Sequence, residues 1–328
     1  MKESQNINMP GPNRVVGGKK NTEANLREYV AAKILFNQKI EEYERPKTLE
    51  ENSLVEDILT RIPNFISEYG AEATKVTLPK QIHMLDASAA HEERVQAFLE
   101  KGVQGGYNEL NGRIEALSNP ENIVATAKIL VHELMHANSF QSLTVTAGVE
   151  AQKRRFGFSL YDGKNAQENQ NAFFEFLNEA ITEELAKRFC ERFLSEISVT
   201  NEQFSRYRNN RKSAYIFPDI TRVDPLQELT SELEWTEARY SYYDERMVLV
   251  SLIQVIFLKN PQMFRTYEDV FKMFSKAMFT GRLLEVARLI EKTFGKGAFK
   301  KIGELTMESV NENNTEKFIE FLDQQEWS

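Results

Sequence analysis

The sequence predicts an α+β fold that is predominantly helical, with a small antiparallel or mixed sheet and a helical C-terminal part. Apolar residues recur at helical spacing near the start of the chain and again from about residue 228 onward. Between these regions, alternating apolar and polar residues predict short strands. Hydrophobic residues make up 41% of the 328 residues, so the chain can bury a sizeable core.

The chain is expected to open with a disordered tail and a helical region. Residues 1–22 are rich in Gly, Pro, Asn and Lys and offer little to bury, which predicts a disordered tail. Residues 23–70 carry apolar side chains at the helical period, which predicts a helical opening region. The clearest examples of this spacing are Leu54, Ile58, Ile62 and Ile66.

Strands are predicted next. The second half of "KVTLPKQIHMLD" alternates in the manner of a strand. The stretch "GGYNELNGRIEAL", residues 105–117, predicts a hairpin in which Asn111 and Gly112 supply the positive φ angles of a tight turn. Residues 143–161 read as irregular strand material, with glycine turns at 148 and 157.

Long helices follow the strands. Asn119 and Pro120 are expected to cap and open a helix that contains no Gly or Pro for about twenty residues. A second long helix is predicted over 168–196, and then a polar loop over about 200–227. Further helices are expected at 228–258, 262–279, 281–294 and 314–325.

Composition limits the partners and the location. A net charge of −8 disfavours a nucleic-acid or anionic-membrane partner, since both require a basic surface. The single Cys190 cannot form an internal disulfide. No apolar run reaches the roughly 18 residues of a membrane helix, and the N-terminus has no signal-peptide pattern. We therefore expect a cytoplasmic protein, and the sequence gives no indication of oligomeric state.

The stretch "LVHELMHA" is the first candidate for chemistry. Residues four apart lie on the same face of a helix, so His132 and His136 can direct two imidazoles at one metal ion. Glu133 lies beside the first of these histidines, where its carboxylate can reach a metal-bound water without binding the metal. The alternative is a pair of core histidines, and it requires that no third ligand lie downstream.

Downstream acids are present in "LNEAITEEL". Glu175, Glu179 and Glu183 follow one another at four-residue spacing on one helix face, surrounded by apolar residues. Stacked like charges are destabilising in a bare helix unless one binds a cation and another accepts a hydrogen bond. Glu179 in particular is expected to have a partner within the protein.

Together, the H-E-x-x-H pattern and the later "NEAITE" resemble the gluzincin metallopeptidases, the thermolysin-like clan. The resemblance covers about residues 105–190 and implies a zincin-like domain, bound Zn²⁺ and an edge strand ahead of the metal-binding helix. It implies that Glu179 is the third zinc ligand, after His132 and His136. It also implies that Glu183 hydrogen-bonds the first zinc histidine, although the thermolysin group has Asp at that place.

The residue that stabilises the oxyanion is less clearly indicated. Thermolysin-like enzymes use a further downstream His, but this chain has no His after position 136. Aminopeptidase-type gluzincins use a Tyr at a comparable remove, and "EARYSYYDERM" offers Tyr240, Tyr242 and Tyr243, with arginines as further alternatives. We favour Tyr243, because the acidic pair after it suits a helix N-terminus.

The sequence therefore predicts a zinc-dependent metallopeptidase that acts on a peptide or protein substrate, with Glu133 as general base. The catalytic domain would span 23–200, and a mostly helical subdomain over 201–328 would complete the cleft. One alternative is a helical regulatory or binding protein with a structural or degenerate zinc site. Another is a protease dedicated to one protein target. Substrate preference and endo- or exopeptidase action are not indicated.

Overall fold

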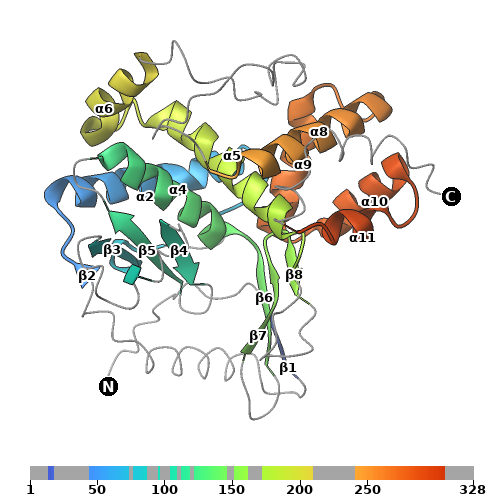
Figure 1. The fold of residues 1–328 in the computed structure, drawn as a ribbon, viewed down its shortest axis with the longest axis horizontal. Helices are drawn as coiled ribbons and strands as arrows, with labels where there is room; N and C mark the ends of the chain where they lie inside the picture. The colour runs from blue at the N-terminus through green and yellow to red at the C-terminus, as the bar shows by residue number, and fades with distance from the viewer. Residues whose placement is uncertain are drawn as a thin grey trace.

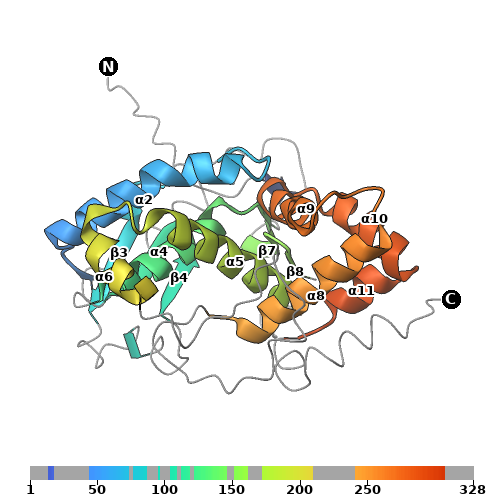
Figure 2. The same cartoon turned by 90° about the horizontal axis from the view of Figure 1, so that it is seen from above.

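The α+β fold is confirmed in a computed structural model of the chain, which is mostly helical with two small sheets (Figures 1 and 2). The structure describes residues 14–17, 44–73, 77–86, 95–96, 104–108, 112–118, 122–145, 151–161, 172–209 and 241–306. Figure 1 shows helix α5 crossing the middle of the molecule, with α4 and α6 on one side and α8 to α11 on the other.

The first sheet precedes the histidine-bearing helix, as predicted. Its strands lie in the order β2 (Glu44–Arg45), β3 (Ile82–Asp86), β5 (Arg113–Ser118) and β4 (Gly105–Asn108). β3 and β5 are parallel and the other pairs are antiparallel, so the sheet is mixed. The β4–β5 hairpin is confirmed in its antiparallel pairing, and Gly112 has a φ of 70°. Asn111 lies outside the described residues.

The second sheet joins distant parts of the chain. Its order is β1 (Arg14–Gly17), β6 (Gln141–Val145), β7 (Ala151–Phe156), β8 (Ser159–Tyr161) and β9 (Ala172–Phe173). The prediction of a disordered tail over 1–22 is wrong for β1, which pairs in parallel with β6. Val15 and Val16 favour an extended backbone, and β6 supplies the partner strand that the sequence alone could not reveal. The other residues of this segment lie outside the described ranges, as does Gly148.

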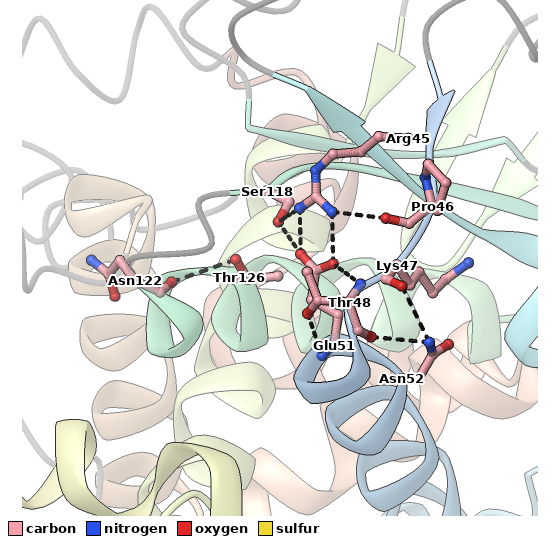
Figure 3. Close-up of polar contacts among 9 residues, drawn as sticks. All are labelled: Arg45, Pro46, Lys47, Thr48, Glu51, Asn52, Ser118, Asn122 and Thr126. Carbon is pink, nitrogen blue, oxygen red and sulfur yellow. Dashed lines mark hydrogen bonds and ion pairs between the residues drawn. The ribbon is translucent and has the colours of Figure 1, made fainter.

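Helix α2 (Leu49–Ser67) is anchored at its start by a buried ion pair (Figure 3). Glu51 accepts two hydrogen bonds from Arg45, at 2.5 and 2.8 Å, and one from the Ser118 hydroxyl at the end of β5. Glu51 also closes a capping box with Thr48. The carboxylate is 1% exposed, so these contacts fix the helix against the edge of the first sheet.

The two central helices begin later than predicted. α4 (Ile123–Asn138) starts at Asn122, whose side chain accepts from the Ala125 amide, and not at Asn119, which lies outside the described residues. α5 (Glu175–Phe193) starts at Glu175 and not at 168. Phe174 lies between β9 and α5 with a φ of 63°, which is not a helical conformation, and its ring packs on Phe299. Local periodicity could not show this, because the cause is a tertiary contact.

The C-terminal helices follow the predicted order, with two corrections. The helix predicted over 228–258 is wrong at Ser241 and Tyr242, because Tyr242 has a φ of 56° and the helix begins only at Tyr243. The segment predicted as a polar loop from 200 contains α6 (Ser198–Asn209), which is held by the buried Phe204. α8 (Tyr243–Lys259), α9 (Tyr267–Thr280) and α10 (Leu283–Phe294) follow, and α11 (Ala298–Gly303) was not predicted. The predicted helix at 314–325 and residues 210–240 lie outside the described ranges.

A continuous hydrophobic core includes side chains from α2, α4, α5, α6 and the helices from α8 to α11. The division into 23–200 and 201–328 stays a prediction, and both parts contribute to this core. Among the described residues, no helix has the length and apolar character that a membrane crossing requires.

Candidate metal centre

Helix α4 brings His132 and His136 together on one of its faces. The residues lie one turn apart, and their Nε2 atoms are 3.1 Å from each other. Both are buried, with 8% and 6% of their surface exposed, because α4 is apolar on most sides and packs between the first sheet and α5. Buried ring nitrogens need partners within the protein or a bound ion.

Helix α5 adds a carboxylate to the pair. Glu179 Oε2 lies 3.4 Å from His132 Nε2 and 3.2 Å from His136 Nε2. The three atoms form a nearly equilateral triangle with sides of 3.1 to 3.4 Å. A tetrahedral zinc ion with ligands at about 2.0–2.1 Å places them about 3.3 Å apart. The donor set and its spacing therefore fit a zinc ion with three protein ligands and an open fourth position.

Glu183 fixes the orientation of the first histidine. Its Oε2 lies 2.6 Å from His132 Nδ1, and its Oε1 accepts a hydrogen bond from the Ser241 amide at 2.7 Å. A carboxylate only accepts, so Nδ1 of His132 must carry the proton. In the neutral ring, Nε2 then presents its lone pair to Glu179 and His136, which is the tautomer that a metal ligand requires.

The charges of the cluster favour a cation at its centre. Burial would lower the pKa of His132, but hydrogen bonds to Glu179 and Glu183 raise this pKa well above the usual value. Burial would raise the pKa of Glu179, but His136 and His132 hold it well below its usual range. Both pKa shifts have the same cause, which is that ring nitrogens and carboxylate oxygens converge here. Such an arrangement favours a positive charge between them, either a proton or a metal ion.

Glu133 lies beside the metal-binding face, against the first strand of the hairpin. Burial raises the pKa of its carboxyl, while His132 and His136 oppose that rise. A Cβ added at Gly105 in β4 would lie 3.0 Å from Glu133 Oε1 and 2.5 Å from Ile129. A glycine at this position therefore lets β4 approach the carboxylate closely.

Tyr242 lies beside the histidine pair and Glu179. Its ring stacks on His132 with centroids 5.6 Å apart, and its hydroxyl hydrogen-bonds Glu179. The nearby Glu179 charge and burial raise the pKa of this phenol well above its usual value, so it remains a proton donor. Tyr242 has a φ of 56°, a strained conformation for a non-glycine residue, directly before α8.

The predicted Tyr243 is the first residue of α8, and its side chain lies outside the described residues, as does Tyr240. Its role stays a prediction. The sequence offered Tyr242 only as an alternative, because its place in the pocket depends on the unusual backbone angle at 242.

The cluster opens into a pocket of about 310 Å³. Its walls come from β4, through Gly105, Gly106 and Tyr107, and from β7 and β8 of the second sheet. His132, Glu133, His136, Glu179 and Tyr242 all line this pocket. The structure therefore places the candidate ligands, the candidate base and the candidate Tyr242 around a single opening.

His83 and Cys190 lie away from this centre. His83 on β3 pairs with Glu44, 2.8 Å away, and Cys190 is buried within α5, so neither lines the pocket. Comparisons of the chain with protein-family models, curated proteins and solved structures give no match. The geometry described above therefore carries the functional argument by itself.

Proposed function

We propose that this chain is a zinc-dependent metallopeptidase, with the gluzincin arrangement that its H-E-x-x-H and "NEAITE" stretches resemble. The single observation that carries the proposal is the triangle of His132 Nε2, His136 Nε2 and Glu179 Oε2 beside an open pocket. Bound at this triangle, zinc would act as a Lewis acid and lower the pKa of a water at its fourth position.

Three residues around the triangle support a role in peptide hydrolysis. Glu133 lines the same pocket and can accept a proton from the attacking water and return it to the leaving amine. The Tyr242 hydroxyl can donate to the oxygen on which negative charge develops. Glu183 holds the tautomer of His132 throughout.

The pocket also suits an extended peptide. β4 is an edge strand of its sheet among the described residues, and three of its residues line the pocket. An edge strand can bind a peptide through main-chain hydrogen bonds. A nucleic-acid or membrane partner is not part of the proposal, and a cytoplasmic location remains a prediction from the N-terminal sequence.

The two alternatives make different demands. A regulatory protein with a structural zinc site has no use for a buried base beside an open coordination position, which is why we favour the enzyme. A protease dedicated to one target would have the same centre. A digest of several unfolded proteins separates a dedicated protease from a general one, since broad cleavage indicates the general enzyme.

Replacing the base tests the proposal. Glu133→Gln should retain bound zinc and lower the hydrolysis of a peptide library by about 10²–10⁴-fold, because the metal ligands remain and the proton acceptor is lost. Zinc content and peptide cleavage are measured on the same preparations. Hydrolysis at the wild-type rate would contradict the mechanism.

The neighbouring tyrosines provide a matched pair of variants. Tyr242→Phe should lower kcat by about 10²–10³-fold with zinc content unchanged, as expected on removal of an oxyanion donor. Tyr243→Phe should remain close to wild type if the contacts of Tyr242 with Glu179 and His132 mark the oxyanion donor. The reverse result would return the role to Tyr243, the residue favoured by the sequence.

A further inference from the structure

Asn178 precedes the third ligand and makes a contact at each end of its amide. Its Oδ1 accepts a hydrogen bond from the Phe158 amide at 2.9 Å, and its Nδ2 donates to Glu179 Oε1 at 3.3 Å. The residue is 1% exposed. One end is thus held by the turn between β7 and β8, and the other end holds the carboxylate oxygen that does not face the histidines.

The β7–β8 turn is shaped to receive this amide. Gly157 has a φ of 56°, and a Cβ there would lie 2.2 Å from Asn178 Oδ1. The Gly157 amide donates to the Phe140 carbonyl at 2.8 Å, and Phe158 is fully buried and stacks on Phe274. The turn is therefore fixed in the core on one side and contacts Asn178 on the other.

We propose that Asn178, held by the Gly157–Phe158 turn, is a positioning residue for the Glu179 carboxylate. With Oε1 engaged by Asn178, Glu179 presents Oε2 alone to the histidine pair and binds a metal through one oxygen. A carboxylate free to rotate could bind through both oxygens and occupy the open position that an attacking water needs. This inference rests on the proposed zinc site and explains how its fourth position stays open.

The test measures metal binding directly, with Asn178→Ala and a matched control. Asn260 is also buried and its amide also joins two elements, through Ile256 and Thr293, but it lies outside the pocket. Zinc affinity is measured by competition with a chromophoric chelator. We expect zinc affinity to fall about 10–100-fold in Asn178→Ala and to stay within about threefold of wild type in Asn260→Ala.

Cobalt reports the coordination itself. The visible spectrum of the Co²⁺-substituted protein depends on the number and geometry of its ligands, which a merely structural role would not change. The spectrum should change in Asn178→Ala and stay unchanged in Asn260→Ala. Asn178→Asp provides a variant that keeps its acceptor for the Phe158 amide, and it should also change the spectrum because its donor to Glu179 is lost.

The turn is tested with two glycines of positive φ. Gly157→Ala adds backbone strain and a collision with Asn178, whereas Gly297→Ala adds comparable strain with no atom within 4 Å of the new Cβ. Weaker zinc binding in Gly157→Ala, but not in Gly297→Ala, supports the inference.

The outcomes separate the inference from the proposed function. If wild type binds zinc and the Asn178 and Gly157 variants match it in affinity and in cobalt spectrum, the inference is overturned while the zinc site stands. If wild type binds no zinc, the proposed function fails and this inference fails with it.

Discussion

Two adjacent glutamates on α5 have opposite surroundings. Glu183 faces α4 and the histidine pair, while Glu184, about 100° further around the helix, faces a cluster of basic side chains. Glu184 accepts from Arg188 Nε at 2.8 Å and from Arg246 Nη2 at 2.7 Å, and Lys187 Nζ lies 3.7 Å away. Both carboxylates are buried, so each one needs a positive partner.

The two clusters differ in where that positive charge comes from. Around Glu184 the chain supplies fixed cations, and the cluster is complete in the folded protein. Around Glu179 and Glu183, the described side chains in direct contact that can carry a positive charge are His132 and His136, whose Nε2 atoms converge on a carboxylate oxygen. The first arrangement stabilises the fold, and the second has room for a cation from solution. A buried carboxylate does not by itself identify a metal site. The side chains that pair with the carboxylate distinguish a metal site from a structural ion pair.

The largest expected effect is on the fold. Glu184→Gln should lower the free energy of unfolding by about 3–5 kcal/mol, because the buried Arg246 guanidinium and Arg188, which also pairs with Glu268, each lose a charged partner. Urea denaturation of the metal-free protein measures it. Zinc affinity should stay within about threefold of wild type, and a large loss of zinc binding would show that the two clusters act as one.

The basic cluster around Glu184 predicts that the protein loses stability at acid pH. Burial would raise the pKa of Glu184, but Lys187, Arg246 and Arg188 lower it to about 2. A lowered folded-state pKa means that the stabilisation is fully present above the unfolded value of about 4.5 and is lost as pH falls towards 2. Stability of wild type should therefore fall by up to ~3 kcal/mol across this range. An equally steep fall in Glu184→Gln would contradict the assignment.

A smaller effect is expected at the neighbouring position. Glu183→Gln should weaken zinc binding by about 10–100-fold, because the partner of His132 Nδ1 loses its charge. Chelator competition on Glu183→Gln and Glu184→Gln, side by side, tests the comparison most sharply. Equal zinc affinities in the two variants would show that Glu183 and Glu184 do not differ in their role at the metal site.

Features that depend on local periodicity could be predicted from the sequence. The one-turn spacing of His132 and His136 follows from helix geometry, and the β4–β5 hairpin follows from its alternation and its glycine. The proximity of Glu179 and Glu183 to the histidines came from the resemblance to a known family. Local pattern alone showed only that these acids share a face.

Features that depend on tertiary contacts could not be predicted. Tyr242 enters the pocket through a positive φ that no glycine signals, and β1 forms only because β6 lies beside it. The roles of Glu184 and Asn178 depend on Arg246 and on the β7–β8 turn, which are distant in sequence. No spacing rule connects such residues.

The central claim is that His132, His136 and Glu179 bind one zinc ion, and metal content tests it most directly. Zinc per chain is measured by elemental analysis on wild type, Glu179→Ala and Glu175→Ala, the last being a control one turn earlier on the same helix and in the same pocket. The account predicts one zinc per chain in wild type and in Glu175→Ala, and almost none in Glu179→Ala. Wild type without zinc, or Glu179→Ala with a full complement, would contradict it.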